Sequence, residues 1–235
     1  MAGILLSLVD SLDTLWLMGL KEEFYEGRDW VRDHLEHGHV GRVSGFETTI
    51  RSLGGLLAAH DCSKDPVFLQ KADDLGSRLV KAYNTPSGLP HGNIDLGSGS
   101  SSNFGWNSNA FILAEVATQQ VEYRYLARAT GKTDYATKSE HVFHILHEMQ
   151  PADGLLFQNI RDGRGKPIFS GSKVSFGAMG DSAYEYMLKV WVQGGKKERT
   201  CHTCRPLRGV QMKRFSTKSM SNPLTPCLHS TSHVP

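Results

Sequence analysis

The chain lacks three features that usually mark a class of protein: a cysteine framework, an excess of charge of one sign, and a long apolar run. Four cysteines occur in 235 residues, and only Cys62 precedes residue 200. No disulfide framework can therefore be read from the main part of the chain. An uninterrupted stretch of about 20 apolar residues, which a membrane span needs, is also missing. The apolar start has no basic region before it and Asp10 interrupts it, so it is a poor signal peptide.

Charge is nearly balanced over the whole chain but uneven along it. The formal net charge of +2 indicates no bulk attraction to nucleic acid or to a membrane. Residues 199–235 hold six basic residues and no acidic one, whereas residues 1–198 hold 20 basic and 24 acidic residues. The last segment also shows no helical or strand periodicity. We therefore expect an ordered body over 1–198 and a basic, disordered tail over 199–235.

The tail carries a group of cysteines and histidines that invites a zinc interpretation. A C-x-x-C pair followed after 22 residues by C-x-H is not a common zinc-finger spacing, and no apolar scaffold surrounds it. A chance cluster is the favoured interpretation of these residues, namely Cys201, His202, Cys204, Cys227 and His229.

The body has the composition of an ordinary soluble protein and the pattern of successive helices. Hydrophobic residues make up 39% and charged residues 21% of the chain. Apolar residues recur at helical spacing from residue 5 to 35, and Asp65-Pro66 predicts the capped start of a further helix. The longest helical pattern runs over 110–130 and ends at Gly131, and others follow over 134–150 and 181–195. This plan predicts an all-α fold of stacked helical hairpins.

Two stretches depart from the helical pattern. Residues 93–109 are rich in glycine, serine and asparagine and are interpreted as a loop, whose length indicates a functional or a mobile segment. Extended segments on either side of Asp162-Gly163 predict a small β-hairpin.

The stretch GFETTIRSLGGLL, residues 45–57, predicts an amphipathic helix with two charges in an unusual place. Glu47 and Arg51 are spaced i, i+4, and on the same side of the helix follow Gly54, Gly55 and Ala58. A solvated face usually carries long polar side chains. Small residues there indicate that another segment or a ligand approaches the backbone closely. The competing interpretation is a surface ion pair of little energetic value.

Other titratable side chains also have two interpretations. Asp181 stands where a helix begins, so it is either a simple N-cap or a functional acid. Glu115 lies among apolar neighbours, an unusual place for an acid unless it is a partly exposed edge position. His141, His144 and His147 lack the glutamate of the H-E-x-x-H zinc motif, and we interpret them as surface or core residues.

Six of these stretches, taken in order from about Leu8 to Lys197, resemble the class I α-1,2-mannosidases of glycoside hydrolase family 47. They are LVDSLDTLWLMGLKEEF, FETTIRSLGGLLAAH, AYNTPSGLP, EVATQQVEYRYLARATG, DGLL and FGAMGDSAYEYMLKVWVQGGK. The resemblance implies an (α/α)7 barrel of helical hairpins, here incomplete because the family's catalytic domain is much longer. Residues 1–198 would be its N-terminal half, and the chain would be an inactive fragment.

The resemblance also assigns roles to residues. In F-E-x-x-I-R the acid protonates the leaving glycosidic oxygen, so Glu47 is expected to be the catalytic acid, with Arg51 orienting it and meeting the sugar. Asp181, in G-D-S-x-Y-E-Y, is expected to help activate the attacking water, and Glu115 to line the sugar cavity. Such an acid has to hold its proton, so burial is expected to raise its pKa while Arg51 opposes that change. Met179 stands where some members carry arginine, and an apolar residue there implies broader, Golgi-like trimming.

Finally, the resemblance implies a reaction, a cofactor and a setting. The reaction is inverting hydrolysis of α-1,2-linked mannose from high-mannose N-glycans, in the endoplasmic reticulum or Golgi, by proteins with a membrane anchor. Ca²⁺ is the implied cofactor, and its threonine ligand and a further catalytic glutamate would lie outside this chain. Two alternatives stay open: a mannosidase-like factor that binds glycans during glycoprotein degradation, and a non-functional truncated product.

Overall fold

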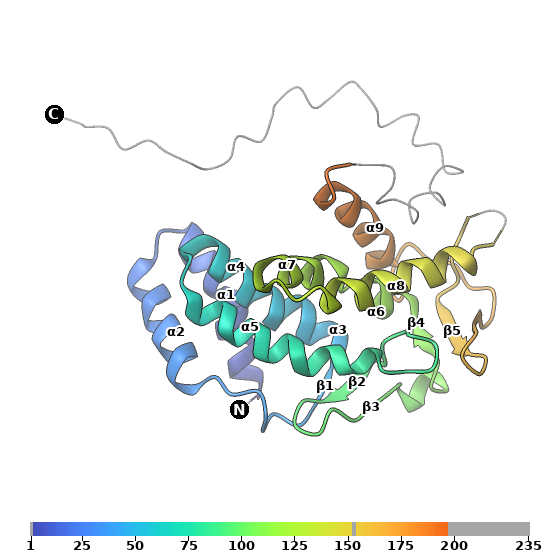
Figure 1. Cartoon of the computed structure of the whole chain (residues 1–235), viewed down its shortest axis with the longest axis horizontal. Helices are drawn as coiled ribbons and strands as arrows, with labels where there is room; N and C mark the ends of the chain where they lie inside the picture. The colour runs from blue at the N-terminus through green and yellow to red at the C-terminus, as the bar shows by residue number, and fades with distance from the viewer. Residues whose placement is uncertain (1, 152–153, 197–235) are drawn as a thin grey trace.

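The computed structural model describes residues 2–151 and 154–196, and the predictions for the tail lie outside these residues. The described part is mainly helical (Figure 1). Its α-helices are α1 Ala2–Leu17, α2 Lys21–His34, α3 Gly45–Thr48, α4 Gly54–Ser63, α5 Pro66–Leu79, α6 Leu113–Ala117, α7 Gln120–Thr130, α8 Asp134–Glu148 and α9 Asp181–Gln193. A π-helical segment, η1 Thr49–Leu53, joins α3 to α4, and 3₁₀ turns are η2 Val80–Tyr83 and η3 Gly105–Asn107.

Consecutive helices pack in pairs, as the sequence predicts. The pairs α1/α2, α4/α5 and α7/α8 are in contact, and α4 also lies against α1 while α7 lies against α5 (Figure 1). Helix α9 packs on α6 and α7. Asp65 caps α5 by accepting a hydrogen bond from the Val67 amide at 2.9 Å, with Pro66 in the first helical turn. The prediction of stacked helical hairpins is confirmed.

The segments between the helices contain short strands, which pair in two small antiparallel sheets. In the first sheet the order is β1 Arg42–Ser44, β2 Asn93–Asp95 and β3 Ser101–Ser102. In the second it is β4 Phe111–Ile112, β5 Asn159–Asp162 and β6 Pro167–Phe169. Strands β5 and β6 form the predicted hairpin around Asp162-Gly163, where Asp162 pairs with Pro167.

A single apolar cluster runs through the described helices. It extends from Val9 and Leu12 of α1 to Met187 and Val190 of α9. Gly55 explains the small residues noted in the sequence: a Cβ there would lie 2.6 Å from the Val9 carbonyl oxygen. What approaches the backbone at Gly55 is therefore α1 itself. Among the described residues, no helix has both the length and the apolar character needed to cross a membrane.

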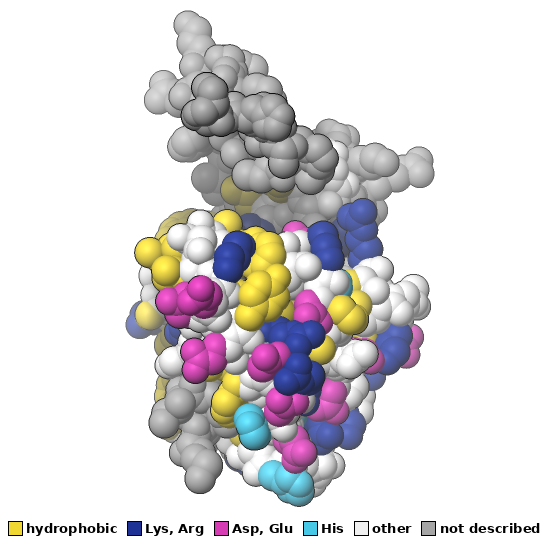
Figure 2. All heavy atoms as spheres, turned by 90° about the vertical axis from the view of Figure 1, so that its left-hand side faces the viewer, with side chains coloured by type: hydrophobic (Ala, Val, Ile, Leu, Met, Phe, Trp, Pro, Cys, Tyr) yellow, Lys and Arg dark blue, Asp and Glu magenta, His cyan; other side chains and the backbone are white. Residues whose placement is uncertain are grey.

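The outer face of α2 carries charges of both signs. Arg28 pairs with Asp29 and, at 2.7 Å, with Asp65 at the start of α5. Arg32 pairs with Asp29 and Asp33. Figure 2, which views this side of the molecule, shows the basic and acidic side chains interspersed. This face has the character of a solvated surface rather than of a site for a highly charged partner.

Two predicted elements differ from the structure. Residues 110–130 do not form one helix, because β4 precedes α6 and the chain breaks at Thr118 and Gln119 before α7. The fully buried Gln120 provides hydrogen bonds to the backbone groups at this break. Its side-chain amide accepts from the Gln119 N–H and donates to the Val116 carbonyl. The predicted loop 93–109 contains β2, β3 and η3, so it is more ordered than its composition indicates.

Candidate active site

Glu47 lies in the first turn of α3 and forms a close ion pair with Arg51. Ser44 is the N-cap and accepts a hydrogen bond from the Glu47 amide at 3.2 Å. The Glu47 carboxylate does not form the reciprocal hydrogen bond to the N-cap residue, Ser44. It accepts from Arg51 Nε at 2.6 Å instead, and a second carboxylate, that of Asp10 on α1, lies 3.6 Å from Arg51. The Glu47 side chain is 46% exposed, so the expected burial of the acid is not found in the described structure.

The helix that carries this pair is not the regular amphipathic helix predicted. Thr49–Leu53 forms a π-helical segment, in which the Thr49 hydroxyl donates to the Gly45 carbonyl at 2.7 Å. A π-segment rotates the following turn relative to an α-helix. Leu53 and Leu57 are therefore buried, whereas Phe46 and Ile50 of the same predicted stripe are only half-buried. Such segments occur frequently at functional sites.

Glu115 approaches the same region from α6. Burial, with a smaller contribution from the negative charge of Glu47, raises the pKa of Glu115 to about 7. A Cβ on Gly92 would lie 2.9 Å from Glu115 Oε2, so the glycine leaves room for this carboxyl. The backbone at Gly92 is fixed because its carbonyl accepts from the Gly45 amide, just before Glu47, at 2.8 Å. Glu47 and Glu115 are thus brought together from segments 68 residues apart in the sequence.

Met179 and Asp181 reach this region through the loop before α9. The Ala114 amide, adjacent to Glu115, donates to the Met179 carbonyl at 3.0 Å, and Met179 has a left-handed backbone (φ 72°). Two residues on, Asp181 is exposed in the first turn of α9. Its interpretation as a simple N-cap is wrong, because Gly180 occupies that position without a capping side chain. Thr118 donates to Ser182 at 2.8 Å and holds the start of α9 against the end of α6.

The three acids share one structural position. Glu47, Glu115 and Asp181 each lie in the first turn of a helix, that is, of α3, α6 and α9. The N-terminal end of a helix favours negative charge, which supports carboxylates there. Of the three, Glu47 is paired with a cation, Arg51, at 2.6 Å.

A fourth acid was not identified from the sequence. Glu122 of α7 accepts a hydrogen bond from the Tyr186 hydroxyl at 2.7 Å, while its Oε2 is buried without a partner in the described structure. Burial raises the pKa of Glu122. It also lies beside Gly54 of α4, whose added Cβ would be 3.8 Å from Glu122 Cγ. The one feature of the sequence that could have identified Glu122 is its spacing of seven residues from Glu115.

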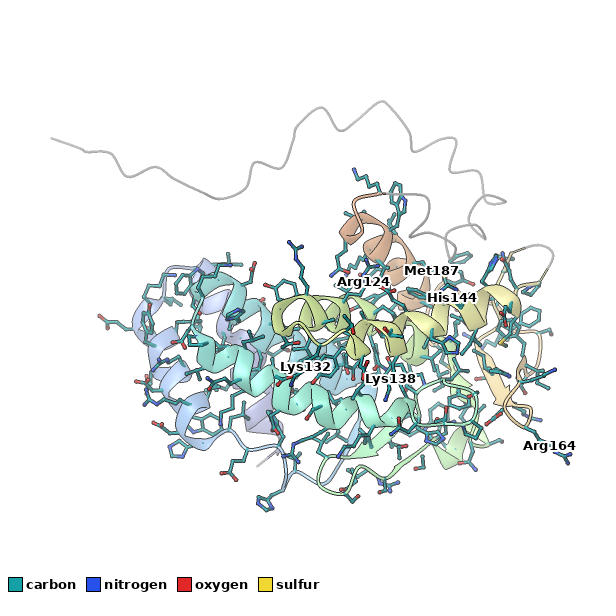
Figure 3. All side chains as sticks on the ribbon, viewed as in Figure 1. Arg124, Lys132, Lys138, His144, Arg164 and Met187 are labelled. Atoms are coloured by element: carbon teal, nitrogen blue, oxygen red, sulfur yellow. The ribbon has the colours of Figure 1, made fainter. Side chains whose placement is uncertain are left out.

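The described residues do not present a metal site. They contain no group of three or more histidine, cysteine, aspartate or glutamate side chains that could hold a metal ion. Ca²⁺ stays a prediction from the resemblance, whose threonine ligand is expected outside this chain. His141 and His144 are exposed on α8, in agreement with a surface role (Figure 3 labels His144). The cysteine and histidine cluster of the tail lies outside the described residues.

Comparison with known proteins identifies the class. The sequence profile of glycosyl hydrolase family 47 matches residues 1–224, so the chain belongs to that family. It is 47% identical over 195 residues to "Mannosyl-oligosaccharide 1,2-alpha-mannosidase MNS1" of Arabidopsis thaliana, covering 83% of this chain and 34% of that protein. It is 43% identical over 198 residues to "Endoplasmic reticulum mannosyl-oligosaccharide 1,2-alpha-mannosidase" of Rattus norvegicus, covering 83% of this chain and 30% of that protein.

A solved structure confirms the fold. The α-1,2-mannosidase from Trichoderma reesei superposes with a TM-score of 0.75 at 26% identity, covering 86% of this chain and 44% of that one. The described helical hairpins are thus part of the family's (α/α)7 barrel, as expected from the resemblance. The chain spans about a third of the length of the curated relatives it matches.

Proposed function

We propose that this chain carries part of the catalytic centre of a mannosyl-oligosaccharide 1,2-α-mannosidase. The substrate is a high-mannose N-glycan, and the reaction is inverting hydrolysis of a terminal α-1,2-linked mannose in the endoplasmic reticulum or Golgi. The observation that carries the proposal is the Glu47–Arg51 pair beside Glu115, in a chain that belongs to family 47.

Each acid has a separate task in the proposed reaction. Glu47 gives a proton to the glycosidic oxygen as the bond to the sugar carbon breaks. Water attacks that carbon from the opposite face, and Asp181 contributes to removing its proton. Arg51 orients Glu47 and contacts the sugar. Glu115 holds a proton near neutral pH and can therefore donate a hydrogen bond to a sugar oxygen.

Met179 bears on which branch is trimmed. Its backbone carbonyl accepts from the amide of Ala114, the neighbour of Glu115, so Met179 lies next to the proposed sugar site. An unbranched apolar side chain supplies no charge-specific contact. We propose from this position a broad branch preference.

Because a further catalytic glutamate is expected outside this chain, the test uses a chimera in which residues 1–198 replace the matching part of the Arabidopsis thaliana relative. Its hydrolysis of α-1,2-mannobiose and of a branched high-mannose glycan tests the proposal. We expect release of mannose with inverted anomeric configuration, observed by NMR. Glu47→Gln is expected to lower the rate by roughly 10²–10⁴-fold, the usual contribution of a general acid. Glu23→Gln, an exposed change on α2, is the matched control.

The outcomes separate the alternatives. Absence of hydrolysis by the unmodified chimera, or equal rates for Glu47→Gln and Glu23→Gln in it, would contradict the proposal. Binding of the glycan without hydrolysis would favour the alternative of a glycan-binding factor. Circular dichroism of each variant shows whether it has kept the fold.

A further inference from the structure

An apolar cavity lies beside the helical segment that carries Glu47 and Arg51. Its volume is about 300 Å³. Leucine and valine side chains of α1, α4, α5, β1 and the neighbouring loops form most of its wall. Thr48 and Ser52, which directly follow the two charged residues, also line it. The volume is at the lower end of the range of about 300–1,000 Å³ that is usual for small-molecule sites.

The wall of this cavity is aliphatic, with few polar groups. In the part of the chain that the structure describes, no lysine, arginine, aspartate, glutamate, phenylalanine, tyrosine or tryptophan lines it, and its polar side chains are Thr48, Ser52 and His37. An apolar cavity of about 150 Å³ can stay free of water and bind benzene. A phosphate would lack a cation here, and a sugar would lose water from many hydroxyls without enough partners to replace it. The wall suits an aliphatic ligand with few polar atoms.

His37 supplies a hydrogen-bond acceptor in this wall. Its side chain is 6% exposed, and its Nδ1 lies 2.9 Å from the Asp74 carboxylate. Burial lowers the pKa of His37, although the hydrogen bond to Asp74 opposes that change, so the imidazole is neutral at neutral pH. A carboxylate only accepts hydrogen bonds, so Nδ1 carries the proton and Nε2 is an acceptor. Within the described residues Nε2 forms no hydrogen bond, and Asp74 does not line the cavity, so the other edge of the ring is available to a ligand there.

Arg78 of α5 fixes the position of this histidine and of part of the wall. Its Nε donates to the Asp74 carboxylate at 3.0 Å, and its guanidinium also donates to the Leu96 carbonyl at 3.0 Å. Leu96 lines the cavity and is buried. One cation therefore holds both the partner of His37 and a wall residue. Side chains held in this way are preorganised for a ligand.

We infer that this cavity binds a small aliphatic alcohol, that is, a neutral molecule with an apolar body and one hydroxyl group. The body fills the space between the leucine and valine side chains, and the hydroxyl donates a hydrogen bond to His37 Nε2. The inference does not depend on the proposed function, because neither Glu47 nor Glu115 lines the cavity.

The experiment is a titration of the ¹⁵N-labelled full chain with octan-1-ol and, separately, with its methyl ether, which has no hydrogen-bond donor. Octan-1-ol is expected to shift the amide signals of Val43, Ser52 and Leu96. It is expected to bind about twofold to tenfold more tightly than the ether, the contribution of one hydrogen bond. In His37→Phe, which keeps a ring but has no acceptor, the alcohol and the ether are expected to bind equally.

Variants that fill the cavity provide a second test. Ser52→Leu adds an aliphatic side chain to the wall and is expected to weaken octan-1-ol binding roughly tenfold or more, because the new side chain takes up the space of the ligand. Ser77→Leu makes the same change at an exposed position of α5 and is the matched control. Val40→Phe, in the loop before β1, fills the cavity from another side and replaces Ser52→Leu if circular dichroism shows that the latter has lost its fold.

Three results of these titrations would overturn the inference. The first is that octan-1-ol leaves the amide signals of the cavity unchanged. The second is that Ser52→Leu or Val40→Phe, once folded, binds it as Ser77→Leu does. The third is that His37→Phe keeps the preference for the alcohol over the ether. α-1,2-Mannobiose is expected to leave the same signals unchanged, and shifts with this sugar would also overturn the inference. Failure of the proposed hydrolysis has no bearing on these results.

Discussion

At the scale of residues, the main feature is that two neighbouring carboxyl groups have different surroundings. Glu47 is half exposed and is paired with Arg51. Glu115 is more buried, and none of the described hydrogen bonds joins its carboxyl group to a cation. This difference arises from burial of one side chain and an i, i+4 partner for the other.

The raised pKa of Glu115 predicts a pH dependence of stability. Because the folded protein binds this proton more tightly than the unfolded chain does, the stabilising effect is complete below the unfolded pKa of about 4.5 and is lost as pH rises to about 7. Glu115→Gln is therefore expected to gain stability over the parent between pH 4.5 and 7.5, by about 1–2 kcal/mol after allowance for partial exposure.

Urea denaturation of the two proteins across this pH range measures the difference, in which other titrating groups largely cancel. A constant difference from pH 4.5 to 8 would show that Glu115 titrates normally. In Glu47→Gln the difference is expected to be smaller, because the Glu47 charge contributes to the raised pKa.

At the scale of elements, Gly54 and Gly55 at the start of α4 show how closely helices α1 and α4 approach. Gly55→Ala would place a methyl group 2.6 Å from the Val9 carbonyl oxygen, which the two backbones cannot relieve without moving apart. We expect a loss of about 1–3 kcal/mol in the free energy of unfolding, the usual cost of overpacking. Thermal or urea denaturation measures it.

Gly54→Ala is the matched control in the same helix. Its Cβ would meet only ordinary contacts, at 3.7 Å from the Thr49 carbonyl oxygen and 3.8 Å from Glu122. The change is expected to be neutral or to stabilise by up to about 1 kcal/mol, because alanine is a better helix former than glycine. Equal losses for the two variants would contradict the packing described for α1.

At the scale of the whole molecule, the continuous apolar cluster predicts cooperative unfolding of the described part. The cluster joins α1, at one end of the sequence, to α9, at the other, so neither end has a core of its own. A small single-core domain usually unfolds in one transition. We expect the fluorescence of Trp16 in α1, that of Trp191 in α9 and the far-ultraviolet circular dichroism to change at one urea concentration.

Variants that keep Trp16 or Trp191 as the single remaining one of the four tryptophans allow each end to be followed separately. A transition of Trp191 at lower urea than that of Trp16 would show that α9 unfolds independently. It would also mean that Asp181 is held less firmly than Glu47, which bears directly on the proposed site.

The sequence alone determined what depends on local spacing. Helical periodicity and the Asp65-Pro66 cap predicted the paired helices, the Asp162-Gly163 turn predicted the hairpin, and the ordered motifs indicated the family. The Glu47–Arg51 contact also followed from spacing, because residues four apart on a helix are neighbours. The roles assigned to Glu47, Arg51, Glu115, Met179 and Asp181 stay predictions.

Only the tertiary structure decided what depends on contacts between distant segments. The break before α7 is stabilised by the buried amide of Gln120, and the first sheet pairs residues 42–44 with 93–95. The pKa of Glu115 is raised by burial where Gly92 approaches its carboxyl group. Periodicity reports which face of an element is apolar, but it does not report which other segment will cover that face, and burial by that segment sets the chemistry of the site.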